Sequence, residues 1–449
     1  MKAELRQNPA STLFATPQNS NISSTLTLGG PLSNLDGACI EKLLLHCANA
    51  LENNDVTLAQ QVMWVLNNVA SSVGDPNQRL ASYFLRALIS RASRLCPTTL
   101  NFNNATSDIH HRLMSVTELA GYVDLIPWHR FGFCASNSAI LKATQGFSKI
   151  HVLDFSITHC MQWPTFIDAL SKGPERAPSL RISVLSWRPL VPPLVNVSIE
   201  DIGLRLSSFA KIKDVPFQFS VIEVGMSTIP QECDFNYDLL LRQLNPSTLK
   251  LRDDEALVVN CQNWLRYLPD EHFDSSYLQN DSCRDSFLDR IKSLNPCVVT
   301  VVDEDCDLGA SNGLGSRIST CFNYLWIPFD ALETFMPKNS TQRIEFEVDV
   351  GHKIENVIGF EGIQRIERLE SCIKFSQRMG SKGFFSLPFC EETKKEVKLL
   401  LDEHASGWGM KKDEDMLILT WKGHNSIYAS VWVPNREYRE NSIQIEFLT

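Results

Sequence analysis

The sequence lacks the local patterns by which metal sites, membrane spans and secretion signals are usually recognised. Its 13 cysteines are spread out, and the nearest two, Cys39 and Cys47, are eight positions apart. Zinc sites usually contain ligand pairs about two to four residues apart, so the cysteines predict no metal site. No apolar run is long enough to span a bilayer, and residues 1–7 contain no signal-peptide core. We therefore expect reduced cysteines, a cytosolic or nuclear location and no membrane contact.

An excess of positive charge is also lacking. The chain has 42 Lys and Arg residues against 52 Asp and Glu residues, which gives a formal net charge of −10. Nonspecific binding to DNA is driven by basic side chains that neutralise phosphates and release counterions. The charge balance therefore argues against a protein held to DNA chiefly by a basic face. A hydrophobic content of 43% and a charged content of 21% are ordinary for a folded globular chain.

Glycine is missing from the loop in which a nucleotide-binding protein would need it. The apolar stretch 149–155 predicts a strand with Asp154 near its carboxyl end, followed by Ser156-Ile-Thr-His-Cys160. Dinucleotide and S-adenosylmethionine sites use glycines here to bring the backbone close to the ligand. The next predicted strand, 180–186, also ends without the carboxylate that would hold a ribose. These absences predict no cofactor, and Asp154 alone is more typical of a residue that bonds to a neighbouring loop.

The chain divides into three parts by composition. Residues 1–36 are rich in Asn, Ser, Thr and Pro without a period and predict a disordered arm. Residues 37–145 have apolar residues at three- and four-residue spacing, which predicts a mainly helical cap. Asp75, Pro76 and Gln78 have the capping-box pattern of a helix start.

Residues 146–449 alternate between strands and helices and predict an α/β core. The strands are apolar runs, as expected where helices cover both faces of a parallel sheet. We expect strands at 150–155, 180–186, 216–222, 256–261 and 297–303 and a closing hairpin at 416–421 and 426–433. One long helix is expected at 353–379, bent at Gly359 or Gly362. The predicted fold class is thus a methyltransferase-like (Rossmann-type), mostly parallel sheet with a terminal antiparallel hairpin and an amino-terminal helical cap.

Three further groups of charged or aromatic residues are interpreted from their neighbours in the sequence. The acidic run Asp303–Asp307 is compatible with Mg²⁺ or Ca²⁺ binding or with a solvated loop. Arg365 and Arg368, among several glutamates, predict ion pairs along a solvated helix. Trp408, Trp421 and Trp432 are expected in the core or in an interface.

Taken together, several segments resemble motifs of the GRAS family of plant transcriptional regulators, and more narrowly its SCARECROW-like members. The resemblance runs from about Cys39 to the end of the chain. The first segment, Leu43–Ala50, resembles the opening of the family's leucine-rich region. The other matching residues are His151, Val152, Leu153, Asp154, Phe155, Gln162, Trp163, Pro164, Arg365, Glu367, Arg368, Trp408, Gly409, Trp421 and Trp432. Two departures are Cys160, where the family usually has glycine, and the segment 321–330, which keeps its motif only in part.

The resemblance implies a nuclear, non-catalytic regulator of plant developmental or hormone-linked genes. Such proteins form homo- or heterodimers with other GRAS proteins and act with zinc-finger transcription factors, and some are also reported to contact DNA. Leu43, Leu44 and Leu51 are the candidate partner interface, although the same leucine stripe could pack within the cap. The alternative is an S-adenosylmethionine-type methyltransferase or small-ligand sensor, with a pocket around Asp154, Asn260 and Asp303.

Overall fold

The computed structural model describes residues 36–95, 112–173, 176–224, 237–269, 282–309 and 313–435. The predicted disordered arm lies outside the described residues, except for its last residue, Asp36. The Asp36 carboxylate accepts a hydrogen bond of 2.8 Å from the backbone N–H of Cys39 and caps the first helix.

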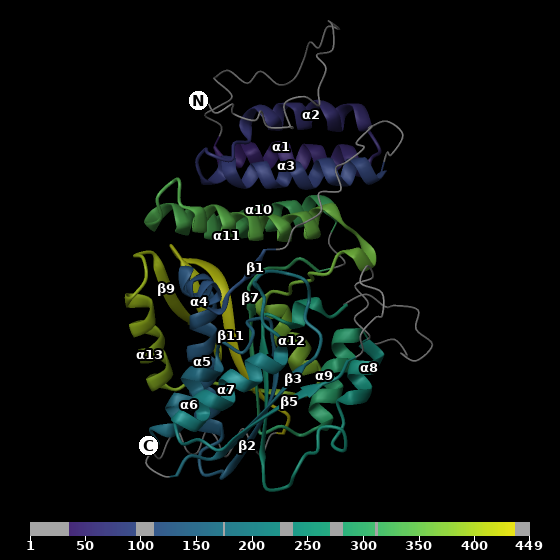
Figure 1. Cartoon of the computed structure of the whole chain (residues 1–449). Helices are drawn as coiled ribbons and strands as arrows, with labels where there is room; N and C mark the ends of the chain where they lie inside the picture. Colours follow the sequence, from purple (N-terminus) through teal and green to yellow (C-terminus); the bar gives the residue numbers. More distant parts are fainter. Residues whose placement is uncertain are drawn as a thin grey trace, which may run out of the picture.

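A mixed nine-stranded sheet forms the centre of the described part of the chain (Figure 1). The first five strands in the spatial order are parallel, and the last three run antiparallel to their neighbours. Its strands, in spatial order, are β5 (Phe217–Ile222), β3 (Ser179–Leu185), β2 (Lys149–Ser156), β6 (Ala256–Gln262), β7 (Val298–Glu304), β11 (His424–Val433), β10 (Met416–Trp421) and β9 (Trp408–Asp413), with β8 (Phe385–Leu387) pairing with β11. The predicted parallel strands and the closing hairpin are confirmed, and β9 extends the hairpin by one strand that the sequence did not reveal.

Helices cover both faces of this sheet, which explains why the strands are apolar runs. Ile150 and Val152 of β2 face one helical layer, whereas Leu153 and Phe155 face the other. The first layer contains α5 (Trp128–Ala143), α6 (Trp163–Ser171), α7 (Ile199–Ile212) and α13 (Glu391–Asp402). The second contains α8 (Tyr237–Gln243), α9 (Cys283–Ser293) and α12 (Cys372–Ser381), with the short 3-10 turn η3 (Leu265–Tyr267) beside them.

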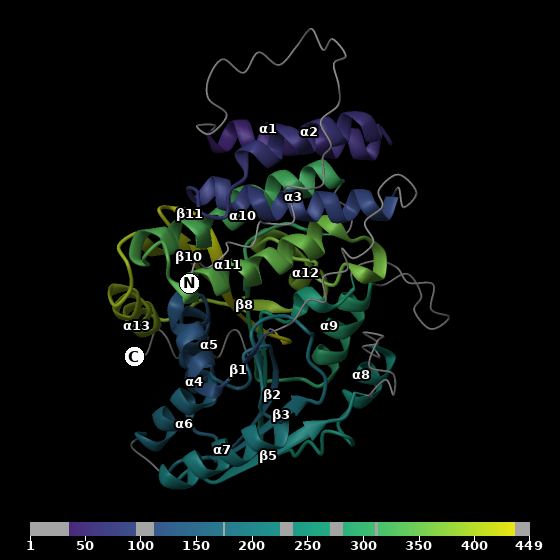
Figure 2. The same cartoon turned by 45° about the horizontal axis from the view of Figure 1, so that its top comes forward.

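The helical cap is assembled from two segments that are far apart in the sequence. In Figure 1, α1 (Gly37–Glu52), α2 (Val56–Val69) and α3 (Pro76–Leu95) stack above α10 (Leu314–Phe335) and α11 (Thr341–Ile354), and Figure 2 shows α10 beside α3. One apolar cluster joins these five helices. By contrast, α4 (Val116–Leu125) packs on α5, and α5 packs on the sheet. By packing, α4 and α5 lie with the sheet, and α10 and α11 lie with the three amino-terminal helices.

Local sequence signals place several helix ends. At the start of α3, the backbone N–H of Gln78 donates to Asp75 Oδ1 at 3.0 Å, and the N–H of Asp75 donates to Gln78 Oε1 at 3.1 Å. This reciprocal pair is the capping box that the sequence predicted. The expected break before Pro127 separates α4 from α5. The two short strands β1 (Leu113–Met114) and β4 (Leu194–Val195) form a separate parallel pair.

The prediction of one long helix at 353–379 is wrong. The α11 helix ends at Ile354 and passes into the π-helix η4 (Glu355–Gly359), the 3-10 turn η5 (Gly362–Gln364) and an extended segment before α12. Gly362 has a φ of +57°, a left-handed conformation that glycine adopts without strain. The charges between residues 361 and 370 recur at helical spacing, but apart from the 3.9 Å contact of Arg365 with Glu361 their ion pairs among the described residues are with other elements.

The 22-residue helix α10 is not among the helices predicted from the sequence. Twelve of its residues are buried, because it lies between the cap helices and the sheet. A helix that is apolar on most sides has no clear amphipathic period, and Pro328 inside it resembles a helix stop. Among the described residues, neither this helix nor any other combines the length and hydropathy needed to cross a membrane.

Candidate functional site

The block 151–155 forms the central strand of the parallel part of the sheet, β2. Val152 and Leu153 are fully buried, and Phe155 packs against Trp264 at a ring-centroid distance of 5.1 Å. His151 is also fully buried, and its Nε2 shares a 2.8 Å hydrogen bond with Ser183 Oγ. Burial and the nearby Arg181 guanidinium lower the pKa of His151 to about 3, so this histidine is neutral at physiological pH.

Asp154 lies at the carboxyl end of β2, and both of its carboxylate oxygens are occupied by protein donors. Asn260 Nδ2 donates to Oδ1 at 2.8 Å, and Trp163 Nε1 donates to Oδ2 at 2.8 Å. Ser156 Oγ adds a third hydrogen bond, of 3.1 Å. Burial raises the pKa of Asp154, while these donors and Arg188 oppose the rise. The aspartate therefore holds the strand, the following loop and α6 together, as its interpretation as a loop-bonding residue predicted.

The motif 162–164 completes this arrangement at the start of α6. Pro164 lies in the first turn of the helix, where its missing N–H costs nothing. Gln162 is buried, accepts a 3.0 Å hydrogen bond from Asn260 Nδ2 and donates one of 2.9 Å to Asn137 Oδ1. Thr300 Oγ1 then donates to Asn260 Oδ1 at 2.8 Å, which connects the network to β7. Buried side-chain hydrogen bonds therefore join the start of α6 to α5, β6 and β7.

The loop after β2 has a backbone that favours glycine. His159 and Cys160 have φ values of +50° and +63°, in the left-handed region that residues with a Cβ adopt at a cost. The position that usually carries glycine in the resembling family is thus one where glycine would remove strain. Cys160 is buried, and its Sγ lies 3.9 Å from Asp154 Oδ2.

These residues do not form the ligand pocket that the alternative prediction required. Asp154 and Asn260 are brought together, but each bonds to the other and to neighbouring side chains. Asp303 lies near the end of β7 and pairs with Arg266 instead. All three side chains are buried. The polar atoms that a cofactor would have to contact are therefore used within the protein.

The acidic run at the end of β7 is partly a buried ion cluster and not a solvated loop. Arg266 of η3 pairs with both Asp303 and Glu304, and Lys353 of α11 reaches Glu304 at 2.5 Å and Glu367 at 3.2 Å. Burial alone would raise the pKa of Glu304, but Arg266 and Lys353 lower it to about 2. Among the residues that the structure describes, no group of His, Cys, Asp or Glu side chains has the arrangement of a metal site.

The segment containing Arg365, Glu367 and Arg368 passes through this buried cluster. The prediction of ion pairs along a solvated helix is wrong, because all three side chains are at most 5% exposed and the backbone is extended. Arg365 Nη1 donates to the carbonyl oxygens of Leu308 and Gly309 at 3.3 Å, and Arg368 Nη2 donates to that of Gly362 at 2.9 Å. These side chains hold the crossing from α11 to α12 against the end of β7.

Of the terminal tryptophans, Trp421 and Trp432 are core residues, and Trp408 packs half-buried against the core. Trp421 is fully buried, donates from Nε1 to Asp330 Oδ2 of α10 at 2.7 Å and contacts the half-buried Trp408 at 4.9 Å between ring centroids. Trp432 is buried and donates to Ser430 Oγ at 2.9 Å. Gly409 lies on β9 opposite Thr420, whose Oγ1 would be 3.2 Å from an added Cβ. Trp421 therefore links the closing hairpin to the cap.

The predicted partner residues Leu43, Leu44 and Leu51 are buried by the chain's own helices. They are at most 6% exposed and belong to the apolar cluster that joins α1 to the other cap helices. The same stripe thus packs within the cap, which was the second interpretation of the pattern. As the chain is folded here, these leucines are not on a surface that a partner can reach, and their role in an interface stays a prediction.

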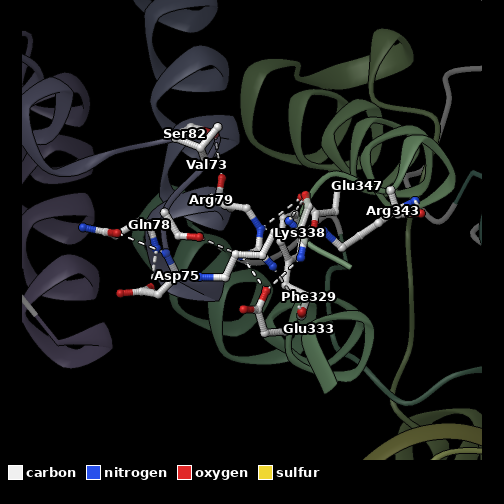
Figure 3. Close-up of polar contacts among 12 residues, drawn as sticks. Val73, Asp75, Gln78, Arg79, Ser82, Phe329, Glu333, Lys338, Arg343 and Glu347 are labelled. Carbon is white, nitrogen blue, oxygen red and sulfur yellow. Dashed lines mark hydrogen bonds and ion pairs between the residues drawn. The ribbon is translucent and has the colours of Figure 1, made fainter. Parts of the chain in front are cut away.

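A buried charge cluster joins the two segments of the cap to each other, α3 to α10 and α11 (Figure 3). Arg79 of α3 is fully buried, and its Nε donates to Glu347 Oε1 of α11 at 3.1 Å. Its Nη1 donates to Glu333 Oε2 of α10 at 2.9 Å, and Arg343 Nη1 reaches the same oxygen at 3.0 Å. Two guanidinium groups and two carboxylates therefore balance one another across three helices.

The outer face of α2 is a surface that sequence reasoning missed. Residues 56–69 contain no charged side chain, and Trp64 is 49% exposed on this outermost cap helix (Figure 1). Depletion of charge together with an exposed tryptophan is typical of the centre of a protein interface. The signal was visible in the sequence as 19 consecutive uncharged residues, 56–74, between Asp55 and Asp75.

A helical cap over a mostly parallel sheet that ends in antiparallel strands is the architecture of a solved GRAS-family structure. A model of the GRAS domain family matches residues 40–433, which is most of the chain. The chain therefore belongs to the GRAS domain family. This membership implies a plant transcriptional regulator.

Known proteins agree with this assignment. The chain is 44% identical over 407 residues to Scarecrow-like protein 32 of Arabidopsis thaliana, covering 89% of this chain and 94% of that protein. It is 30% identical to Protein SHORT-ROOT of Arabidopsis thaliana, covering 88% of this chain and 73% of that protein. The crystal structure of SCL7 in Oryza sativa matches with a TM-score of 0.70 at 27% identity, covering 88% of this chain and 99% of that one. The similarity to the solved structure bears out the predicted α/β fold with its terminal antiparallel strands and amino-terminal helices.

Proposed function

We propose that this protein is a non-catalytic nuclear regulator of transcription that acts through contacts with other proteins in plant developmental or hormone-linked gene control. The observation that carries the proposal is the hydrogen bonding among buried side chains at the carboxyl end of β2. Asp154 and Asn260, which would face a ligand in a methyltransferase, bond to each other and to Trp163. Buried polar groups that satisfy one another give no free donors or acceptors for a substrate.

The partner is proposed to be another GRAS protein, in a homo- or heterodimer, bound through the outer face of α2. Trp64 is the anchor of this contact, and the uncharged polar side chains around it, such as Gln61 and Asn68, form its rim. Desolvating this face costs little because no charge has to be buried. We also propose that the protein binds zinc-finger transcription factors and contacts DNA directly. The net charge of −10 favours recruitment by a basic partner over autonomous DNA binding.

The test of the non-catalytic role is thermal unfolding with and without S-adenosylmethionine. A ligand at about a hundred times its dissociation constant stabilises the native state by about 2.7 kcal/mol, which is a clear shift in the melting curve. We expect no shift. A shift of that size, lost in an Asn260→Leu variant that still folds, would support the methyltransferase or ligand-sensor alternative.

The test of the partner surface is the mass in solution by light scattering, for the protein alone and with a promoter duplex at low and moderate salt. We expect Trp64→Asp to remove self-association or pairing with a second GRAS protein. The matched control is Ile373→Asp on α12, because Ile373 is 62% exposed but lies on a different helix. If both variants lose association equally, or if Trp64→Asp loses none, the assignment of this face is contradicted. Salt-sensitive DNA binding by the protein alone would show a direct DNA contact.

A further inference from the structure

The outer face of α7 is apolar although the described part of the chain covers only its inner face. Leu204 is 66% exposed and Ile212 is 79% exposed, whereas Leu206, on the side that faces the sheet, is buried. An open hollow of about 450 Å³ lies along this outer face. Its lining comes entirely from α7 and consists of Asp201, Leu204, Arg205, Ser208, Phe209 and Ile212.

The inner face of α7 shows that the exposure is not the result of loose packing. A Cβ added to Gly203 would lie 2.4 Å from the ring of Phe219, so the helix backbone packs closely on β5. Ser198 caps the helix start with a 3.0 Å hydrogen bond from the backbone N–H of Asp201. The outer face is therefore held rigidly, with its apolar side chains directed away from the sheet.

Four positions of this face are complementary to one another when the helix is reversed about Leu206. Residues 201, 204, 208 and 211 recur at three- and four-residue spacing and share one side of the helix. Reversal places Asp201 opposite Lys211 and the large Leu204 opposite the small Ser208. An antiparallel arrangement also sets the acidic first turn beside the basic last turn, which agrees with the helix dipoles.

We propose that α7 binds α7 of a second copy of this chain in an antiparallel, two-fold symmetric contact. Leu204 of each copy enters the hollow above Ser208 of the other, and two symmetric Asp201–Lys211 ion pairs flank the apolar centre. Among the described residues, neither Asp201 nor Lys211 has an ion-pair partner, whereas Lys213 next to the same helix pairs with Asp168. A two-fold contact uses the same patch on both copies, so it needs this self-complementarity.

This contact is separate from the proposed interface on α2. In both views α7 lies at the end of the molecule away from the cap (Figures 1 and 2). One chain can therefore use both surfaces at once, so that pairs formed through the caps are joined into larger assemblies. A single helix pair buries less than the roughly 800 Å² per partner of a standard interface, so the contact is weak and forms at high local concentration.

The test uses sedimentation velocity of the full chain carrying Trp64→Asp, which removes the cap surface from the measurement. Over about a hundredfold concentration range we expect a reversible monomer–dimer equilibrium. Asp201→Lys and Lys211→Asp, each added alone, place like charges opposite one another at two sites and weaken self-association by about tenfold. Leu204→Asp abolishes it. Leu399→Asp is the matched control, because Leu399 is 67% exposed on α13 and should leave the equilibrium unchanged.

Mixing the two charge variants separates this proposal from damage to the fold. The Asp201→Lys chain carries a positive charge at both positions, and the Lys211→Asp chain carries a negative charge at both. In a mixed dimer, both sites therefore regain opposite charges, and a one-to-one mixture should associate as strongly as the parent chain. The proposal would be overturned by a mixture that associates as weakly as each variant alone. It would also be overturned by a parent chain that stays monomeric or by a Leu204→Asp variant that still dimerises.

Discussion

Replacing Arg79 with methionine removes one of the four charges in the cluster that joins α3 to α10 and α11 (Figure 3). Methionine has a similar length and keeps the apolar contacts of the side-chain stem. Glu347 is then left buried with only Arg343, while Glu333, whose side chain is 27% exposed, can recruit water. The variant therefore creates about one uncompensated negative charge inside the cap, between α3 and the two helices α10 and α11.

The size of the effect follows from this imbalance. Removing one partner of a buried ion pair costs about 3–5 kcal/mol, and the partial exposure of Glu333 places Arg79→Met near the lower value, about 3 kcal/mol. Adding Glu347→Met restores the balance, because the Arg343–Glu333 pair at 3.0 Å remains. Glu347→Met alone leaves Arg79 with only the partly exposed Glu333 and should cost about 2–3 kcal/mol. The double variant should be no less stable than Arg79→Met alone, so the coupling energy equals the cost of Glu347→Met, about 2–3 kcal/mol.

The assay is urea unfolding followed by far-ultraviolet circular dichroism and tryptophan fluorescence, with linear extrapolation to water. Arg86→Met on the same helix is the control, because Arg86 is exposed and only lies over the Tyr83 ring, so its loss should cost less than about 1 kcal/mol. The reasoning is refuted if Arg79→Met is within about 1 kcal/mol of the wild type. It is also refuted if the costs of the two substitutions simply add.

Three further outcomes can be measured in the same way. Gly351→Ala should destabilise by about 1–3 kcal/mol, because the added Cβ would lie 2.2 Å from the Tyr83 ring, whereas Gly121→Ala, with no atom within 4 Å, should gain up to about 1 kcal/mol. Asp154→Leu should cost about 2–4 kcal/mol, because the buried donors of Trp163 and Asn260 lose their acceptor, and unchanged stability would contradict this. Glu304 has a pKa of about 2, below its ordinary 4.5, so its contribution to stability is complete above pH 4.5 and is lost as the pH falls through 2. Urea midpoints measured against pH should accordingly fall less steeply over that range for Glu304→Gln than for the wild type.

The features that could be predicted from the sequence are those whose cause lies within one element. The parallel strands were recognisable because both of their faces are buried and the runs are apolar throughout. The capping box at Asp75 and the break before Pro127 also depend only on neighbouring residues. The absence of a glycine loop predicted that Asp154 bonds to neighbouring protein groups. The sequence did not indicate that these groups are Trp163 and Asn260.

The features that could not be predicted depend on partners from distant segments. Arg365 and Glu367 are spaced as on a solvated helix, but their contacts come from residues near Leu308 and from Lys353. The leucines of α1 show the same stripe whether they meet a partner or the chain's own helices, and only the position of α10 decides between the two. The exposure of Trp64 could not be predicted from apolar periodicity, because the feature that distinguishes α2 is its lack of charged residues.

The division of the cap between two segments also determines when it can form during synthesis. More than two hundred residues separate the end of α3 at Leu95 from the start of α10 at Leu314. At about 5–20 residues per second, a ribosome needs on the order of 10 to 40 s to make this stretch. Throughout that interval the apolar faces of α1 and α3 that later meet α10 have no permanent cover, so the nascent chain presents them to chaperones. A stalled or truncated product that ends before α10 therefore carries an exposed leucine surface, and degradation of such fragments would be the expected fate in the cell.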